Sequence, residues 1–295
     1  MAVFLAVPNV SEGRDQRVID ELSRVVSARA RLLDRHSDKA HNRTVLTVAG
    51  GADDLIAALP ALAGAALERI DMSKHEGAHP AVGAIDVCPI VYPSEELREE
   101  AEAIAHDVAA GIGDVGIPVF LYGRLAGREE HRERAFFRDG GFDAIVDRIE
   151  SEELAPDHGP PTAHATAGVC LVTARPPLAA FNVWLGDGQA AQARAIAAEL
   201  REAGGGLPGV RAIGLDLDGT AQVSMNIHDP VGTPLAEVLE RVEELAESHG
   251  AEVSHAELVG LVPAGAMDGW PVGVPLDGFD EERSVIEERL AELVA

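Results

Sequence analysis

Short apolar runs and amphipathic stretches alternate along the first half of the chain. Residues 16–29 and 55–69 place their apolar side chains at helical spacing, so each is predicted to form a helix with one buried face. Four apolar runs are closed by proline, glycine or polar residues, which is typical of β-strands: 3–7, 31–34, 44–48 and 84–91.

The second half repeats this order. Helices are predicted at 189–202 and 233–249, and strands at 180–185, 210–217, 222–227 and 258–262, with a further helix in the tail, 280–294. The succession strand–helix–strand–strand–helix–strand is that of a ferredoxin-like unit. We therefore expect an α+β protein of two such subdomains, each with helices on one face of its sheet, with a cleft between them.

The segment between the two repeats departs from this pattern. A helix is predicted at 94–110 and a strand at 119–122, and the charge-rich stretch 124–153 is also predicted to be helical. Residues 155–168 are rich in Pro, Gly, Thr and His without an apolar period, so we expect a functional loop that connects the domains. The predicted domains are 1–172, which includes this loop, and 173–295.

Composition narrows the classes of partner. Hydrophobic residues make up 46% of the 295 residues, which is enough for a large buried core. The formal net charge of −26 disfavours a nucleic acid or an anionic membrane as a partner, although local cations can still bind small anions. Two cysteines, Cys88 and Cys170, and a short apolar N-terminal run predict a cytoplasmic protein without disulfides, membrane contact or metal.

Two short motifs match known sites in their letters only. The segment 75–79 (HEGAH) spells the H-E-x-x-H zinc motif, which requires a helix. Gly77 is a poor helix former and Pro80 disfavours helical geometry at His79, so we expect no zinc site there. The segment 216–220 (DLDGT) spells the nucleophile motif of haloacid-dehalogenase-like phosphatases, but Asp-Gly between alternating segments is typical of a two-residue hairpin turn.

Polar, glycine-containing segments recur at the ends of the predicted strands. They are VPNVSEG at 7–13, HNRT at 41–44, DMSKHEGAHP at 71–80, LYG at 121–123, APDHGP at 155–160, AFN at 180–182, QVSMN at 222–226 and LVGLVP at 258–263. Taken in order, these segments resemble the formiminotransferase family, which includes the N-terminal domain of the bifunctional formiminotransferase-cyclodeaminases.

The resemblance implies a fold and a reaction. Members of this family have two similar α/β subdomains with the substrate cleft between them, and they commonly form dimers. They transfer the formimidoyl group from N-formimidoyl-L-glutamate to N5 of tetrahydrofolate, a late step of histidine degradation. The resemblance therefore implies a cytoplasmic one-carbon transferase that uses tetrahydrofolate as co-substrate, forms a homodimer and leaves cyclodeaminase activity to a separate partner enzyme.

The resemblance also implies site residues. The catalytic histidine of the family corresponds to His79, and an imidazole with a pKa near 7 can take the proton from N5 and return it to the leaving nitrogen. From the residues alone, a turn histidine without a role is the favoured interpretation of this position, and only the resemblance favours catalysis. The folate-contacting loop of the family corresponds to Gly159, Pro160, Pro161, Thr162, Ala163, His164, Ala165, Thr166, Ala167 and Gly168.

The substrates carry carboxylates, so cations are expected near the reacting groups. Arg43 and Lys74, together with Asn42, are the best candidates, and a surface salt bridge is the alternative for both cations. In animal members an acidic residue after the second strand is proposed to assist catalysis; here His36 stands at that position, and the nearest carboxylates are Asp34 and Asp38. Three aromatic residues are expected in the core rather than against a pterin: Tyr122, Phe181 and Trp184.

Two other functions are compatible with the same sequence. One is a transferase of formyl groups, acting on formyl-glutamate or 5-formyltetrahydrofolate, because family resemblance does not separate the two donors. The other is a non-catalytic folate-binding module, which the variant His79→Ala would distinguish from an enzyme.

Overall fold

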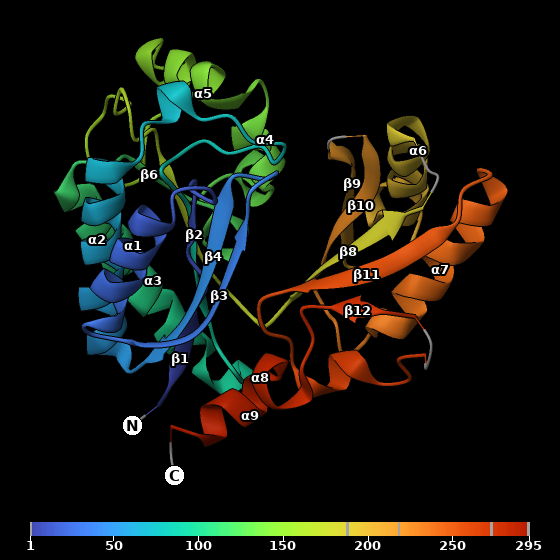
Figure 1. Ribbon diagram of the computed structural model, residues 1–295. Coiled ribbons are helices and arrows are strands. Elements are labelled where there is room, and N and C mark those ends of the chain that lie inside the picture. Colours follow the sequence, from blue (N-terminus) through green and yellow to red (C-terminus); the bar gives the residue numbers. More distant parts are fainter. Residues whose placement is uncertain (1, 187–188, 218, 272–273, 294–295) are drawn as a thin grey trace. The chain divides into compact units, whose positions relative to one another are not determined.

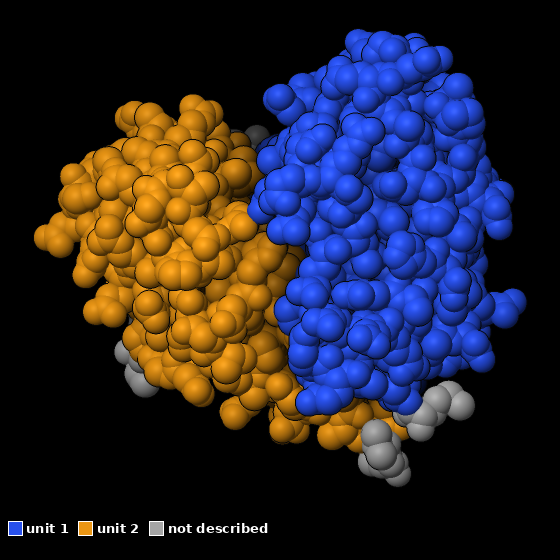
Figure 2. Space-filling model, turned by 180° about the vertical axis from the view of Figure 1, so that it is seen from behind, with its two compact units in different colours: residues 1–176 blue, residues 177–295 orange. Residues whose placement is uncertain are grey.

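The computed structural model describes residues 2–186, 189–217, 219–271 and 274–293. The chain divides into two compact units, Met1–Pro176 (unit 1) and Pro177–Ala295 (unit 2), which are coloured separately in Figure 2. No helix in these described ranges is long and apolar enough to cross a membrane.

Unit 1 is built on a mixed sheet with three long helices on one face (Figure 1). The helices are α1 (Gln16–Ser27), α2 (Ala52–Arg69) and α3 (Arg98–Val115). The strands are β1 (Phe4–Ala6), β2 (Asn9–Val10), β3 (Arg31–Asp38), β4 (Arg43–Gly50), β5 (Ile85–Val91), β6 (Val119–Leu121) and β7 (Cys170–Arg175). Strands β5, β7 and β6 run parallel to one another, and the other pairs are antiparallel.

The side chains of β4 show how this sheet separates its two faces. Leu46 and Val48 are fully buried in the core beneath the three helices. Because successive side chains of a strand point to opposite faces, Arg43 and Val45 lie on the other face. That second face is partly covered by the short helices α4 (Arg134–Arg138) and α5 (Gly141–Glu150), whose apolar side chains pack with Phe120.

The charge-rich stretch 124–153 is not the continuous helix predicted from the sequence. It begins with two 3₁₀ turns and continues as α4 and α5. Gly140 lies between these two helices and Gly141 is the first residue of α5; their φ angles are 76° and 75°. Positive φ angles are incompatible with a right-handed helix and cost glycine little, so the helical pattern ends there.

The loop 155–168 lies within unit 1. It is followed by β7, a strand missed in the sequence, which pairs with both β5 and β6. The expectation that this loop connects the two domains is therefore wrong, because the chain returns to the first sheet before it enters unit 2 at Pro177. The apolar run after Gly168 was the signal for this strand.

Unit 2 contains a second sheet with the strand order β12-β11-β8-β10-β9. Phe181 and Val183 of β8, with Val223 and Met225 of β10, pack in the core with α6 and α7. The strands are β8 (Ala179–Leu185), β9 (Val210–Leu217), β10 (Thr220–Ile227), β11 (Val253–Val259) and β12 (Leu276–Asp277), and the helices are α6 (Ala190–Leu200) and α7 (Leu235–Ser248).

Both sheets contain the strand order of a ferredoxin-like unit, which confirms the predicted fold class. In unit 1 the order is β5-β1-β4-β3, and in unit 2 it is β11-β8-β10-β9, with antiparallel neighbours throughout. The predicted hairpin is also confirmed, since Leu217 pairs with Thr220; Asp218 between them lies outside the described residues.

Two smaller predictions in unit 2 are wrong. Trp184 is not part of the core beneath α6 and α7, because it alternates with Val183 and so lies on the opposite face. The tail is not one helix but α8 (Glu281–Ser284) and α9 (Ile286–Ala291). Val285 between them forms a β-bridge with Val262, which interrupts the helix; Val294 lies outside the described residues.

Candidate active site

Four loops of unit 1 meet at one end of its sheet. Val10 of β2 pairs both with Thr44, near the start of β4, and with Ile85, the first residue of β5. Four loops therefore lie together. Residues 11–15 follow β2, residues 39–42 join β3 to β4, residues 70–84 lead into β5, and residues 155–169 lead into β7. This end of the sheet carries most of the residues predicted for the site.

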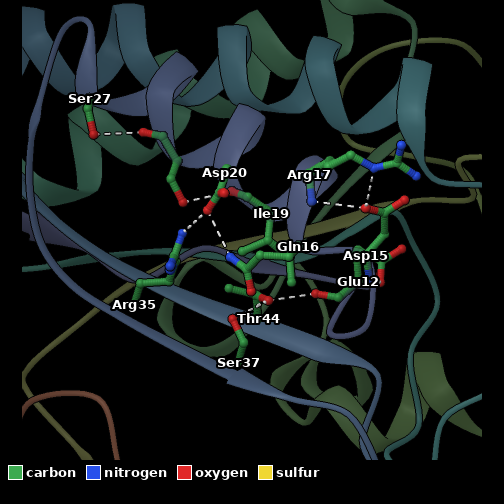
Figure 3. Close-up of polar contacts among 11 residues, drawn as sticks. Glu12, Asp15, Gln16, Arg17, Ile19, Asp20, Ser27, Arg35, Ser37 and Thr44 are labelled. Carbon is green, nitrogen blue, oxygen red and sulfur yellow. Dashed lines mark hydrogen bonds and ion pairs between the residues drawn. The ribbon is translucent and has the colours of Figure 1, made fainter.

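The first of these loops is tied to the turn between β3 and β4. The Thr44 hydroxyl donates to the carbonyl oxygen of Glu12 over 2.6 Å and shares a second hydrogen bond with the Ser37 hydroxyl (Figure 3). The backbone N–H of Gly13 donates to Oδ1 of Asn42 over 3.0 Å. These side-chain contacts hold two segments of the site in one position, although they are far apart in the sequence.

The same turn holds the segment that carries His79. Asn42, buried and with a positive φ of 48°, donates from Nδ2 to the carbonyl oxygen of Glu76 over 3.1 Å. The N–H of Ala78 donates to the carbonyl oxygen of Ala40 over 3.0 Å. Gly77 allows this approach, because a Cβ there would lie 2.3 Å from the carbonyl oxygen of His41. Asn42 is thus a positioning residue in this structure.

The HEGAH segment is not helical, as Gly77 and Pro80 predicted. A 3₁₀ turn, Met72–Lys74, ends before it, and His75 is extended. Within the part of the chain that the structure describes, no three His, Cys, Asp or Glu side chains are grouped in a way that would hold a metal ion.

The hydrogen bond of His79 determines which ring nitrogen is basic. Nδ1 lies 2.8 Å from the carbonyl oxygen of Pro80, and a carbonyl only accepts, so Nδ1 carries the proton. Nε2 is then the nitrogen with the lone pair, which is the form a general base needs. The ring is partly exposed and lies edge-on to His41, with 6.0 Å between the ring centroids.

Burial and nearby cations keep the His79 ring neutral. Loss of solvation lowers its pKa well below the usual range, and the charges of Arg43 and Arg138 lower it further, followed by His41 and Arg134. Burial lowers the pKa of Arg43 itself to about 10, with Arg138 acting in the same direction. Arg43 therefore remains charged at neutral pH while His79 stays unprotonated.

Three arginines, Arg43, Arg134 and Arg138, form what we call the arginine cluster. Arg138 pairs with Asp86, a carboxylate that is 1% exposed and also accepts from the N–H of Val82 over 2.8 Å. Burial lowers the pKa of Arg134, whose guanidinium lies 6.0 Å from the centre of the Tyr122 ring. One buried carboxylate among three guanidinium groups leaves a positive site that suits an anionic ligand.

The sequence predicted only Arg43 of this cluster. Arg134 and Arg138 stand in the charge-rich stretch 124–153, which the sequence predicted to be helical without assigning it a role. Their spacing of four residues places them on the same side of a helix, and this was the only signal in the sequence. Neither the pairing with Asp86 nor the proximity to His79 is encoded in that spacing.

The second half of the predicted folate loop is bound to the base of the His79 segment. The N–H of Met72 donates to the carbonyl oxygen of Thr166 over 2.7 Å, and the N–H of Ala84 donates to that of Ala167 over 2.9 Å. Within the loop, Nδ1 of His164 accepts from the N–H of Ala167 over 3.0 Å. Ala167 and Gly168 are buried, whereas Pro161, Thr162 and Ala165 are exposed.

The first half of this loop lies elsewhere on the same unit. Gly159, with a φ of +85°, packs against the last turn of α3, where a Cβ would lie 2.9 Å from Cα of Gly113. Along the remaining stretch, three residues are partly exposed: Pro160, Ala163 and His164. The ten predicted residues therefore run from the end of α3 to the base of the His79 segment.

Two predicted residues have other surroundings. Lys74 forms an exposed ion pair with Asp71, with 2.7 Å between Nζ and Oδ2 and a side chain that is 81% exposed. His36 lies in β3 opposite Val45, on the same face of the sheet as Arg43. Asp38 is the acidic residue directly opposite Arg43, and its Oδ1 accepts from the N–H of His41 over 2.7 Å.

The contacts of Asn42 lead to a first prediction. Asn42→Gly keeps the positive φ accessible and removes the amide that holds Glu76 and Gly13. We expect turnover to fall by at least ~10-fold through misplacement of His79, with the fold retained. Lys74→Ala, which removes an exposed ion pair, should stay within about twofold of the wild type. Equal turnover in both variants would contradict the positioning role.

Family models match both units of the chain. The formiminotransferase domain, N-terminal subdomain, matches residues 3–175, and the formiminotransferase domain matches residues 180–269. A glutamate formimidoyltransferase from Streptococcus pyogenes serotype M1 is 39% identical over 292 residues, which cover 96% of this chain and 97% of that protein.

Two further relatives extend the comparison. A glutamate formimidoyltransferase from Thermoplasma acidophilum is 33% identical over 298 residues and 98% of each chain. A formimidoyltransferase-cyclodeaminase from Gallus gallus is 38% identical over 272 residues, which cover 88% of this chain and 50% of that protein. These matches confirm the resemblance seen in the sequence, and the chain belongs to the formiminotransferase family.

Proposed function

We propose that this protein transfers the formimidoyl group of N-formimidoyl-L-glutamate to N5 of tetrahydrofolate, yielding 5-formimidoyltetrahydrofolate and L-glutamate in histidine degradation. The observation that carries the proposal is the match over 97% of the length of a relative named glutamate formimidoyltransferase. The chemistry of unit 1 supports it, because a neutral imidazole lies beside a cluster of cations.

We assign the proton transfers to His79. As N5 attacks the formimidoyl carbon, a new N5–C bond forms and Nε2 of His79 takes the proton from N5. The imidazolium then protonates the glutamate nitrogen of the tetrahedral intermediate, and the C–N bond to glutamate breaks. A His79 pKa below its usual range favours this second step, because it makes the imidazolium a stronger acid.

We assign carboxylate binding to the arginine cluster. Both substrates carry glutamate carboxylates, and a planar guanidinium can bind a carboxylate through two parallel hydrogen bonds. Arg43 forms no ion pair with the described residues, in contrast to Lys74, which is paired with Asp71. In the folate loop, the exposed residues are the ones we propose to contact tetrahydrofolate: Pro161, Thr162 and Ala165.

The remaining parts of the proposal concern the state of the protein. We propose that it acts as a homodimer in the cytoplasm, with small molecules as substrates. Sedimentation of the purified chain at several concentrations would test the dimer, and a single monomeric species would overturn it.

A two-donor assay tests the reaction. We expect purified protein to consume N-formimidoyl-L-glutamate only when tetrahydrofolate is present, and to release L-glutamate in equal amount. N-formyl-L-glutamate serves as the matched donor, and we expect a lower kcat/KM with it. A higher kcat/KM with the formyl donor would reassign the donor. Folate binding without turnover of either donor would favour the non-catalytic module.

A further inference from the structure

Arg175 is a fourth arginine on the face of unit 1 that carries the arginine cluster. It is the last residue of β7 and alternates with Ala174, which lies in the core beneath the three long helices. Its side chain therefore projects from the opposite face, which α4 partly covers. Arg175 is half-buried and forms no ion pair with the described residues, and its Nη1 donates to the carbonyl oxygen of Pro176 over 2.9 Å.

Tyr122 joins Arg175 to the arginine cluster. The Thr173 hydroxyl donates to the carbonyl oxygen of Tyr122 over 2.7 Å, which ties the end of β6 to β7. The guanidinium of Arg134 lies 6.0 Å from the centre of the Tyr122 ring. Burial lowers the pKa of Arg175 to about 10, and the charge of Arg134 lowers it further against the opposing effect of Tyr122. Arg175 therefore remains charged at neutral pH.

Arg175 lies far along the sheet from the reacting groups. Strand β7 begins at Cys170, directly after the loop whose second half is bound to the base of the His79 segment. The five residue steps from Cys170 to Arg175 rise by roughly 3.3 Å each, so Arg175 lies about 16 Å farther along the strand. It pairs with Val91, the last residue of β5, whereas Asp86 is next to the first. Asp86 and Arg175 thus mark opposite ends of this face.

The four arginines therefore fall into two pairs. Arg43 and Arg138 lie at the His79 end, because Arg43 begins β4 and Arg138 pairs with Asp86. Arg134 is one helical turn from Arg138 and lies beside Tyr122, on the way to Arg175. Among these arginines, Arg43 lowers the pKa of His79 most, followed by Arg138 and then Arg134. We call Arg43 and Arg138 the proximal pair, and Arg134 and Arg175 the distal pair.

The two substrates of the proposed reaction differ in how far their carboxylates lie from the reacting atoms. In N-formimidoyl-L-glutamate, the formimidoyl group is bonded directly to the glutamate nitrogen. In tetrahydrofolate, a methylene group, an amino group and a benzoyl ring separate the pterin from the glutamate tail. When the formimidoyl carbon and N5 meet at His79, the carboxylates of the donor lie close to that ring and those of tetrahydrofolate lie remote from it.

We infer that the distal pair, Arg134 and Arg175, binds the glutamate tail of tetrahydrofolate, while the proximal pair binds the donor. This inference rests on the proposed function. Neither arginine of the distal pair has a carboxylate partner among the described residues, and a planar guanidinium binds a carboxylate through two parallel hydrogen bonds. Within the cluster, Asp86 already occupies Arg138, so Arg175 supplies a cation that two glutamate-bearing substrates require.

The first test compares two arginine variants in the full chain. Arg175→Gln should raise the KM for tetrahydrofolate about 10-fold, because a charge-assisted contact to the tail is lost. Because the contact is remote from His79, kcat and the KM for N-formimidoyl-L-glutamate should stay within about twofold of the wild type. Arg132→Gln is the matched control: it removes the same charge from an exposed arginine paired with Glu129, and all these constants should be unchanged.

Three small ligands locate the contact through their Kd values, which titration calorimetry measures without turnover. Arg175→Gln should raise the Kd for p-aminobenzoyl-L-glutamate about 10-fold, because this fragment keeps the tail of folate. The Kd for 6-methyltetrahydropterin, which has no tail, and the Kd for L-glutamate should not change. Arg43→Gln should give the reverse pattern: weaker binding of L-glutamate and unchanged binding of p-aminobenzoyl-L-glutamate.

Two further variants keep the test decisive. Arg175→Lys retains the charge without the planar group, so its Kd for p-aminobenzoyl-L-glutamate should lie between those of the wild type and Arg175→Gln. Far-UV circular dichroism checks the fold of each variant. If Arg175→Gln does not fold, Arg134→Gln replaces it, with the same pattern expected for the three ligands.

Three outcomes would overturn the inference. A KM for tetrahydrofolate equal in Arg175→Gln and Arg132→Gln would mean that Arg175 does not bind the tail. A larger rise in the KM for N-formimidoyl-L-glutamate would assign Arg175 to the donor. Equal weakening of all three small ligands would mean a structural role. Absence of turnover by the wild type with either donor would instead overturn the proposed function, while the Kd for p-aminobenzoyl-L-glutamate would still test Arg175.

Discussion

Replacing His79 with alanine should lower kcat at least ~100-fold while leaving the fold intact, because the proposed base and acid are removed together. The ring is partly exposed, and it donates a hydrogen bond to the carbonyl oxygen of the next residue, Pro80. Its loss should therefore change the free energy of unfolding by only about 0.5 kcal/mol. Steady-state rates at saturating donor and tetrahydrofolate, with far-UV circular dichroism of the same samples, measure both quantities.

A second histidine variant provides the control. His106 lies in α3 and is exposed, and His106→Ala should keep kcat within about twofold of the wild type. Turnover of His79→Ala near that of His106→Ala would remove His79 from the mechanism. If the wild-type protein binds tetrahydrofolate but turns over neither donor, the non-catalytic folate-binding module is favoured instead.

The pH profile of the wild type checks the same assignment. Burial and the charges of Arg43 and Arg138 lower the pKa of His79, so its ring remains neutral from pH 7 down through its usual pKa of 6.5. A general base works in its neutral form, so kcat/KM should decline only below pH 6.5. A decline that begins above pH 7 would contradict a depressed pKa.

Replacing Asp86 with alanine should destabilise unit 1 by about 3–5 kcal/mol, the range measured when one partner of a buried ion pair is removed. Asp86 is 1% exposed and accepts hydrogen bonds from Arg138 and from the N–H of Val82. Without it, the guanidinium of Arg138, whose side chain is 12% exposed, loses its partner in a low-dielectric environment. The positive charges of Arg43 and Arg134 nearby add to the cost.

Urea denaturation followed by far-UV circular dichroism measures this loss. Both tryptophans of the chain, Trp184 and Trp270, lie in unit 2, so their fluorescence does not report directly on unit 1. Asp71→Ala is the matched control, because the Asp71–Lys74 pair is exposed and should contribute less than about 1 kcal/mol. If the two aspartate variants lose the same stability, the buried pair does not stabilise unit 1 as proposed.

The strand and helix order was readable from the sequence because it depends on local patterns. Buried strands such as β5 appear as short apolar runs, and α1 repeats its apolar residues at helical spacing. The missed strands were the very short β2 and β12, and β7, which follows a long loop without a regular pattern. The break between α4 and α5 was missed because two adjacent glycines were included in a helical stretch.

The site was readable only in part. His79 stood out because its segment resembles a family motif, and Asn42 and Arg43 because they stand directly before a predicted strand. Arg134 was missed because a charged residue in a helix usually faces solvent.

The sequence by itself determined the two ferredoxin-like repeats, the family and the histidine at the centre of the proposed reaction, because periodicity and motifs are properties of neighbouring residues. Only the tertiary structure decided which polar groups meet. Asp86 and Arg138 are separated by 52 positions and Asn42 and Glu76 by 34, and no local pattern records such pairs. The charges around His79, and hence its low pKa, arise from residues that the folded chain alone brings together.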